Sequence, residues 1–77
     1  MFLKLGDKIV NSEHILAISK DKGIEIMLDT QQDIKAYRGA DDETLDEVIN
    51  VLYSALVNNE DITDEMIAQR LKIQKAS

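Results

Sequence analysis

Apolar residues in the first 38 positions recur in short runs that alternate with polar residues, the pattern of strands with one buried face. The clearest run spans residues 24–29, where every second residue is isoleucine or leucine. Similar runs span 2–5, 8–10, 14–19 and 33–37, and they are separated by the turn-forming segments Gly6-Asp7, Lys20-Asp21-Lys22-Gly23 and Asp29-Thr30-Gln31-Gln32. The pattern predicts an antiparallel meander of four or five short strands over about residues 2–38.

From Asp41 onward the spacing of the apolar residues changes to every third or fourth position, which is typical of a helix with one packed face. Asp41, Asp42 and Glu43 provide an N-cap candidate and acidic first-turn residues, which the helix dipole favours. The spacing therefore predicts one long amphipathic helix over about residues 41–57.

The apolar side of this helix is unusually wide. Val51, Tyr53 and Val57 lie outside the main apolar stripe and widen the arc to roughly 240°, against the ~100° that a packed helix face needs. We therefore expect a second surface, besides the sheet, to cover part of the helix.

A second helix is predicted over about residues 64–75. Thr63 has the position of its N-cap, and Ile62 and Ile67 have the spacing of a hydrophobic staple around that cap. We expect this helix either to cover the first helix or to pack on a neighbouring subunit.

Composition and charge place these elements in a single α+β domain, residues 1–77, with antiparallel strands in 1–39 and helices in 40–77. The net charge of −6 is local: residues 41–65 contain nine acidic residues and no basic one, whereas the basic residues of the last twelve positions are Arg70, Lys72 and Lys75. There is no cysteine and no apolar run long enough to span a membrane, so we expect a cytoplasmic protein.

Catalytic and metal-binding chemistry is not expected. The only histidine, His14, begins a predicted strand beside Glu13 and Ile15, with no nucleophile next to it. The segment that starts at Asn59 spaces oxygen ligands like a calcium loop, yet it lacks the glycine and the glutamate that such a loop requires. We expect no enzyme activity, no cofactor and no bound metal.

Nucleic-acid binding is the weakest of the alternatives. Residues 62–73 resemble the first helix of a helix-turn-helix, but the sequence ends at Ser77 before a recognition helix could follow. A basic C-terminal helix could still contact nucleic acid through Arg70, Lys72 and Lys75.

A second resemblance covers more of the chain. The strand at 24–28 and the acid-led helix are similar in spacing to the small flagellar proteins of the FlbD/SwrD type; the residues concerned are Asn11, Glu13, Ile15, Ile18 and Glu47-Val48-Ile49. Those proteins are short, non-enzymatic accessories. Their Pro-Asp-Thr turn is replaced here by Asp21-Lys22-Gly23.

These patterns favour a non-catalytic protein-interaction or regulatory module that forms homo-oligomers through its helical half. We predict a self-association interface made of Val51, Tyr53, Val57, Met66 and Leu71. The alternative is an acidic inhibitor or decoy, of the kind found in phages and mobile elements, that binds a basic, nucleic-acid-binding target. Its predicted contact patch consists of Asp41, Asp42, Glu43, Asp46 and Glu47.

Overall fold

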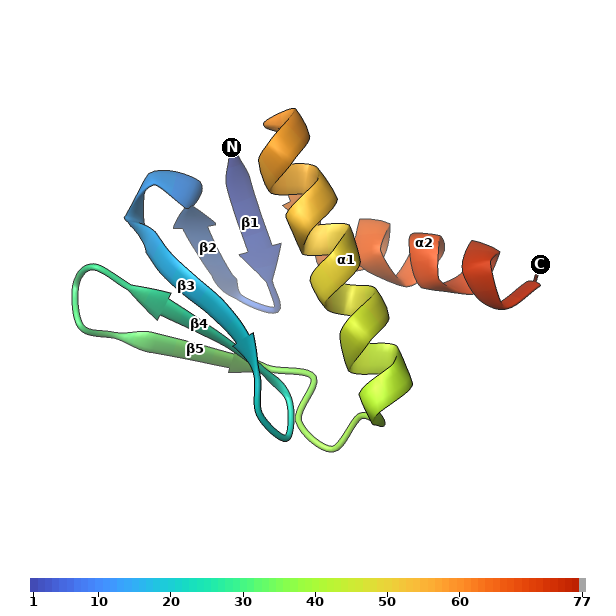
Figure 1. Ribbon diagram of the computed structural model, residues 1–77. Coiled ribbons are helices and arrows are strands. Elements are labelled where there is room, and N and C mark those ends of the chain that lie inside the picture. The colour runs from blue at the N-terminus through green and yellow to red at the C-terminus, as the bar shows by residue number, and fades with distance from the viewer. Residues whose placement is uncertain (77) are drawn as a thin grey trace.

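The computed structural model describes the backbone of residues 1–76 and the side chains of residues 1–72 (Figure 1). Its elements in chain order are β1 (Phe2–Leu5), β2 (Lys8–Asn11), the 3₁₀ helix η1 (Ser12–His14), β3 (Ile15–Lys20), β4 (Ile24–Leu28), β5 (Asp33–Ala36), α1 (Asp42–Asn58), β6 (Ile62–Thr63) and α2 (Asp64–Ala76). The chain is thus α+β, as predicted, and both helices occur close to their predicted ranges.

The strands form two three-stranded sheets instead of one meander. One sheet has the order β2-β1-β6 and the other the order β3-β4-β5. The break between them is η1, where the Asn11 side chain accepts a hydrogen bond from the Glu13 N–H (3.1 Å) and turns the chain. His14 belongs to this turn, so the prediction that it begins a strand was wrong.

Strand β6 lies in the half of the chain that was predicted to be entirely helical. It pairs in parallel with β1, with Leu3 opposite Ile62. Side chains next to β6 add to this pairing: Asp61 accepts a hydrogen bond from the Phe2 N–H (2.8 Å), and Asp64 accepts one from the Gly6 N–H. The start of the sequence is therefore fastened to the segment between the two helices.

The predicted hairpin turns are present. Gly6, with φ of +62°, joins β1 to β2. In the β3–β4 turn the left-handed residue is Lys22 (φ +57°). Gly23 serves a different purpose there, because a Cβ on it would lie 3.0 Å from the Ala36 carbonyl oxygen. This glycine lets the turn approach the end of β5 closely.

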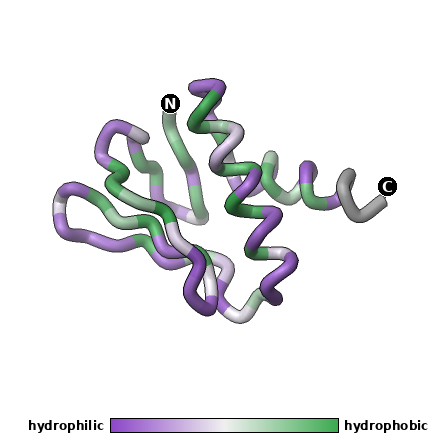
Figure 2. The backbone as a smooth tube through the Cα atoms, viewed as in Figure 1, coloured by the Kyte–Doolittle hydropathy of each residue, from purple (hydrophilic) through white to green (hydrophobic). Residues whose placement is uncertain are grey.

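One hydrophobic core lies between the two sheets and the two helices. Figure 2 shows the hydrophobic segments along β1, β3 and the middle of α1, and hydrophilic residues in most of the turns. The side chains that are essentially inaccessible to solvent come from both sheets and both helices: Leu3, Ile24, Ile26, Leu45, Val48, Leu52, Ala55, Ile62 and Ile67.

Both helices begin with the caps that the sequence predicts. The Asp41 side chain accepts a hydrogen bond from the Thr44 N–H (3.1 Å) at the start of α1. Thr63 Oγ1 accepts one from the Met66 N–H (3.3 Å) at the start of α2, and the staple residues Ile62 and Ile67 are fully buried. Because α2 contacts α1 of the same chain, it covers the first helix within one molecule.

Candidate protein-binding groove

A groove of about 320 Å³ lies between β3 and α1. Its lining comes from η1, β3 and α1 and is mostly apolar: Ser12, Ile15, Leu16, Ala17, Ile18, Ile49, Leu52, Tyr53 and Leu56. We call this surface the β3–α1 groove. Its volume is at the lower end of the range for small-ligand sites, and it is only partly enclosed, which suits a segment of chain better than a small molecule.

Large apolar side chains on the walls of the groove face solvent. Leu16 is 69% exposed and Tyr53 is 68% exposed, whereas Leu56 is 38% exposed. The register between β3 and β4 shifts between Ile15 and Ala17, a bulge at Leu16. A bulge re-aims the side chain that it carries, which explains why a leucine in a strand points away from the core.

The helix wall of the groove is one margin of the apolar arc of α1. Ile49, Tyr53 and Leu56 form this margin, which we call the outer flank of α1. Val51 lies about 200° around the helix from Tyr53, on the opposite margin, which we call the inner flank. The inner flank is buried, because Val51 is only 5% exposed and belongs to the same core cluster as Ile67 of α2.

The five residues predicted for a self-association interface therefore separate into two groups. Tyr53 and Val57 are exposed on α1. Met66 and Leu71 are partly buried and pack against the core of their own chain, and Val51 lies within that core. Helical spacing shows that Val51 is apolar, but it does not show that this side chain belongs to the same core cluster as Ile67 of α2.

The predicted acidic patch is also divided by the helix. Asp42 and Glu43 are exposed in the first turn of α1, and Asp41 caps that turn. Asp46 lies one turn later on the same side as Tyr53. Glu47 is on the inner flank, where one of its carboxylate oxygens is buried without a hydrogen-bond partner among the described residues.

One end of the groove is marked by an ion pair between its two walls. Lys20, the last residue of β3, donates a hydrogen bond to Asp46 of α1 at 2.8 Å. This hydrogen bond, together with the charges of Asp46 and Asp42, raises the pKa of the Lys20 ammonium. Both side chains are exposed, so the pair fixes the position of the groove end more than it stabilises the fold.

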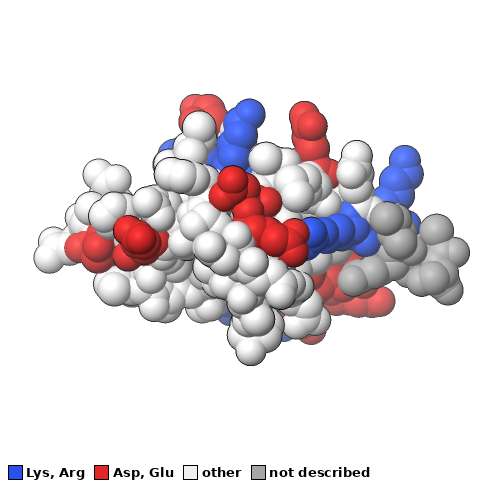
Figure 3. Space-filling model, turned by 90° about the horizontal axis from the view of Figure 1, so that it is seen from above, with Lys and Arg blue, Asp and Glu red and all other residues white. Residues whose placement is uncertain are grey.

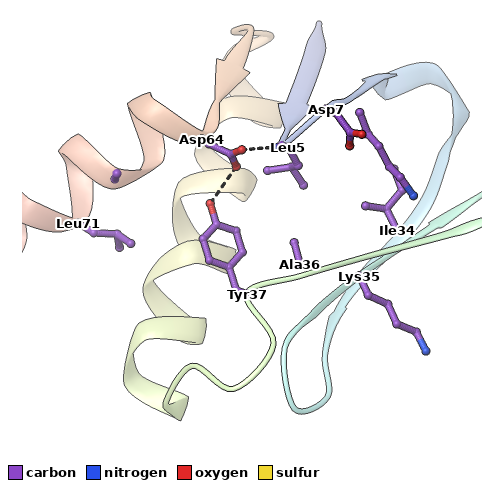
Figure 4. A pocket seen from close by; sticks show the side chains of 11 residues that line it. Leu5, Asp7, Ile34, Lys35, Ala36, Tyr37, Asp64 and Leu71 are labelled. Carbon is purple, nitrogen blue, oxygen red and sulfur yellow. Dashed lines mark hydrogen bonds between the residues drawn. The ribbon is translucent and has the colours of Figure 1, made fainter.

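A second cavity, of about 570 Å³, lies on another side of the molecule between the β1–β2 turn, β5 and α2. Figure 4 shows Asp64 between the hairpin turn and Tyr37, whose hydroxyl donates a hydrogen bond to it at 3.4 Å. Burial first, and then the Asp64 carboxylate, raises the pKa of Tyr37 to about 12. The Tyr37 hydroxyl and the Gly6 N–H thus both bind Asp64, the first residue of α2, and hold this end of the helix to the sheets.

Other charged groups form local pairs. His14 Nδ1 lies 3.1 Å from Asp29 Oδ2 on the surface, and Arg70 donates a hydrogen bond to Glu60 at 3.1 Å. Lys72 is exposed, whereas the side chain of Lys75 is outside the described residues. On the face seen from above in Figure 3, acidic and basic side chains are interspersed.

Within the described residues, no group of three or more histidine, cysteine, aspartate or glutamate side chains could hold a metal ion. In the same part of the chain, neither helix is long and apolar enough to cross a membrane. The chain matches no protein-family model, no curated protein and no solved structure.

Of the residues that line the groove, the predicted interface contained only Tyr53, and it missed the two exposed leucines, Leu16 and Leu56. Leu56 fits the stripe of α1 that packs on the sheet, and only the structure shows that it lies at the edge of that contact. Leu16 lies in the apolar run 15–18, so the neighbouring residues do not indicate whether its side chain faces the core or the solvent. The two-residue period of a strand predicts which side chains are buried only if the position of the bulge is already known.

Proposed function

We propose that this protein is a non-catalytic protein-interaction module whose contact surface is the outer flank of α1 together with β3. The observation that supports this function best is the β3–α1 groove, with Leu16 and Tyr53 more than two-thirds exposed on either side. Exposing large apolar side chains next to each other on a small domain is unfavourable unless a partner covers them.

The simplest partner is a second copy of the chain. The core is complete without Tyr53 and Val57, so these two side chains are free for an outside contact. They lie one turn apart on the same side of α1, where a second molecule could bury both together. A domain of 77 residues also has little core of its own, and self-association would bury more apolar surface.

Sedimentation velocity over a concentration series tests self-association. We expect the wild type to form dimers or larger assemblies at high micromolar concentration, and Val57→Glu to be monomeric because the contact would then bury a charge. Ile9→Glu is the matched control, because Ile9 is equally exposed (68%, against 65% for Val57) but lies on the other sheet. A monomeric wild type at these concentrations would contradict self-association.

A second candidate function is docking on a basic target through the start of α1. It is favoured by the exposed carboxylates of Asp42, Glu43 and Asp46 on a helix that has no basic residue. An affinity based on these charges falls steeply with added salt. Replacing the three residues by Asn, Gln and Asn should abolish capture of a basic partner at low salt, and capture that is insensitive to both changes would exclude this function.

A further inference from the structure

Strand β3 is an edge strand. Its sheet has the order β3-β4-β5, and in the part of the chain that the structure describes β4 is the strand that pairs with it. The opposite edge of β3 therefore presents backbone N–H and C=O groups that no strand satisfies. This edge faces the side on which the β3–α1 groove lies, because residues 15–18 of β3 form one wall of the groove.

The two edges of this sheet differ in how they are protected. Along β5, the other edge, Asp33 and Lys35 are charged, and Arg38 lies two residues beyond the end of the strand. Charged side chains on an edge discourage pairing with another chain. In β3 the single charged residue is Lys20 at its end, and its ammonium is bound to Asp46. The edge of β3 is thus the one left open to pairing.

An extended segment fits this site better than a helix does. A helix laid against the edge of β3 would cover its unpaired backbone groups without binding them, which is costly in an apolar surrounding. An added strand would pair with those groups. Every second side chain of that strand would point into the groove, towards Leu16, Tyr53 and Leu56, and the others would point to solvent.

Charge indicates which segment would be preferred. Asp42 and Asp46 lie on the same side of α1 as Tyr53, at the end of the groove where Lys20 ends β3. Lys20 compensates one of these two carboxylates, and the exposed Glu43 adds a further negative charge nearby. A basic residue at the end of an apolar segment would complement this end of the groove.

We infer that the β3–α1 groove binds an extended segment of a partner protein, which adds to β3 as a fourth strand of its sheet. This inference rests on the proposed interaction function, but it assigns the groove to a segment of another protein instead of to a second copy of the chain. The segment has apolar side chains at alternate positions and a lysine or arginine at the end next to Asp42 and Asp46. A second copy of the chain is the competing occupant.

A library of random 12-residue peptides displayed on phage tests this inference. It is selected on the wild type and, in parallel, on Leu16→Glu, with Ile9→Glu as the control for an exposed apolar residue outside the groove. We expect peptides with alternating apolar residues and a terminal Lys or Arg to be enriched on the wild type and on Ile9→Glu. On Leu16→Glu their enrichment should fall at least about tenfold, since a charge would stand in the apolar site.

The backbone of a selected peptide gives the decisive readout. N-methylation removes one amide donor at a time, and a strand that pairs along one edge uses every second amide. We therefore expect the affinity to fall by about tenfold or more when one alternate set of amides is methylated. Methylation of the other set should leave the affinity nearly unchanged. Hydrogen exchange of the β3 amides should slow when the unmodified peptide binds.

Other outcomes overturn the inference, and they do so in distinguishable ways. If the peptides bind as helices, or tolerate methylation at every position, strand addition is excluded. The proposed interaction function would still hold in that case. If peptides bound monomeric Val57→Glu and not a dimeric wild type, the groove would belong to the second copy. A failure to enrich any peptide, combined with a monomeric wild type, would overturn both this inference and the proposed function.

Discussion

The two flanks of α1 both carry large apolar side chains, yet one flank is buried and the other borders an open groove. The inner flank carries Val51, which is buried in the core that α2 helps to close, and the outer flank carries Tyr53 and Leu56, which border an open groove. Both flanks carry apolar residues, although Glu47 also lies on the inner one, and both belong to the same 17-residue helix. What separates them is the position of α2, whose first residue, Asp64, is bound to the β1–β2 turn through the Gly6 N–H. The width of the apolar arc of a helix therefore shows how much of its surface must be buried. The rest of the fold decides which element buries it.

The largest expected effect is on the helix that closes the inner flank. Ile67 is completely buried, and Ile67→Ala should lower the free energy of unfolding by about 2–5 kcal/mol, from lost burial and the cavity left behind. Urea denaturation followed by circular dichroism measures this change. A loss below about 1 kcal/mol would mean that α2 does not pack on its own chain.

A matched pair on α1 compares the flanks directly. Val51→Ala should cost about 2 kcal/mol, because it removes two buried carbons and leaves a cavity. Val57→Ala removes the same atoms from an exposed site and should change the stability by less than about 0.5 kcal/mol. The same denaturation experiment, run below the concentration of self-association, measures both. Equal effects at the two positions would contradict the division of α1 into a closed and an open flank.

The N-cap of α2 should have a smaller effect. Thr63→Ala removes the acceptor for the Met66 N–H and should cost about 1 kcal/mol. Thr63→Ser keeps a hydroxyl at this position and serves as the control. If Ala and Ser had the same effect, the capping hydrogen bond would not contribute to holding α2 over the inner flank.

A further effect is confined to high pH. The pKa of Tyr37 is raised to about 12 in the folded protein, from 10.0 in the unfolded chain, so the folded state holds this proton more tightly. The stability that this provides is complete below pH 10 and is lost as the pH rises through 12. Denaturation midpoints measured between pH 9 and 12 should therefore fall more steeply for the wild type than for Tyr37→Phe. Parallel slopes would show that Tyr37 is not shielded beside Asp64.

Much of the fold follows from local patterns. The long helix, its Asp41 cap, the Thr63 cap and the Gly6 turn are all set by residues within a few positions of one another. Strand β6 could not be predicted in this way. It has only two residues, Ile62 and Thr63, and it is a strand because β1 lies beside it.

The candidate site was predictable only in part, for the same reason. Tyr53 and Val57 were identified from their position outside the main stripe of α1, and they are exposed. Val51 meets the same criterion but is buried, since its cover comes from a distant element. Leu16 is exposed because of a bulge in the pairing of β3 with β4, and pairing irregularities leave no mark in a run of apolar residues.

The parallel pairing of β1 with β6 also sets an order of events during synthesis. Leu3 can pair only after Ile62 has been synthesised, and until then one edge of β1 has no strand beside it. The hairpin β1–β2 and the sheet β3-β4-β5 close over short loops, whereas this last pairing closes a loop of almost the whole chain and so carries the larger entropic cost. A nascent chain stalled before residue 61 should hence expose the first strand to chaperones and to other chains. For that interval the chain has two open edges, that of β1 and that of β3, and only the edge of β1 closes when β6 pairs with it.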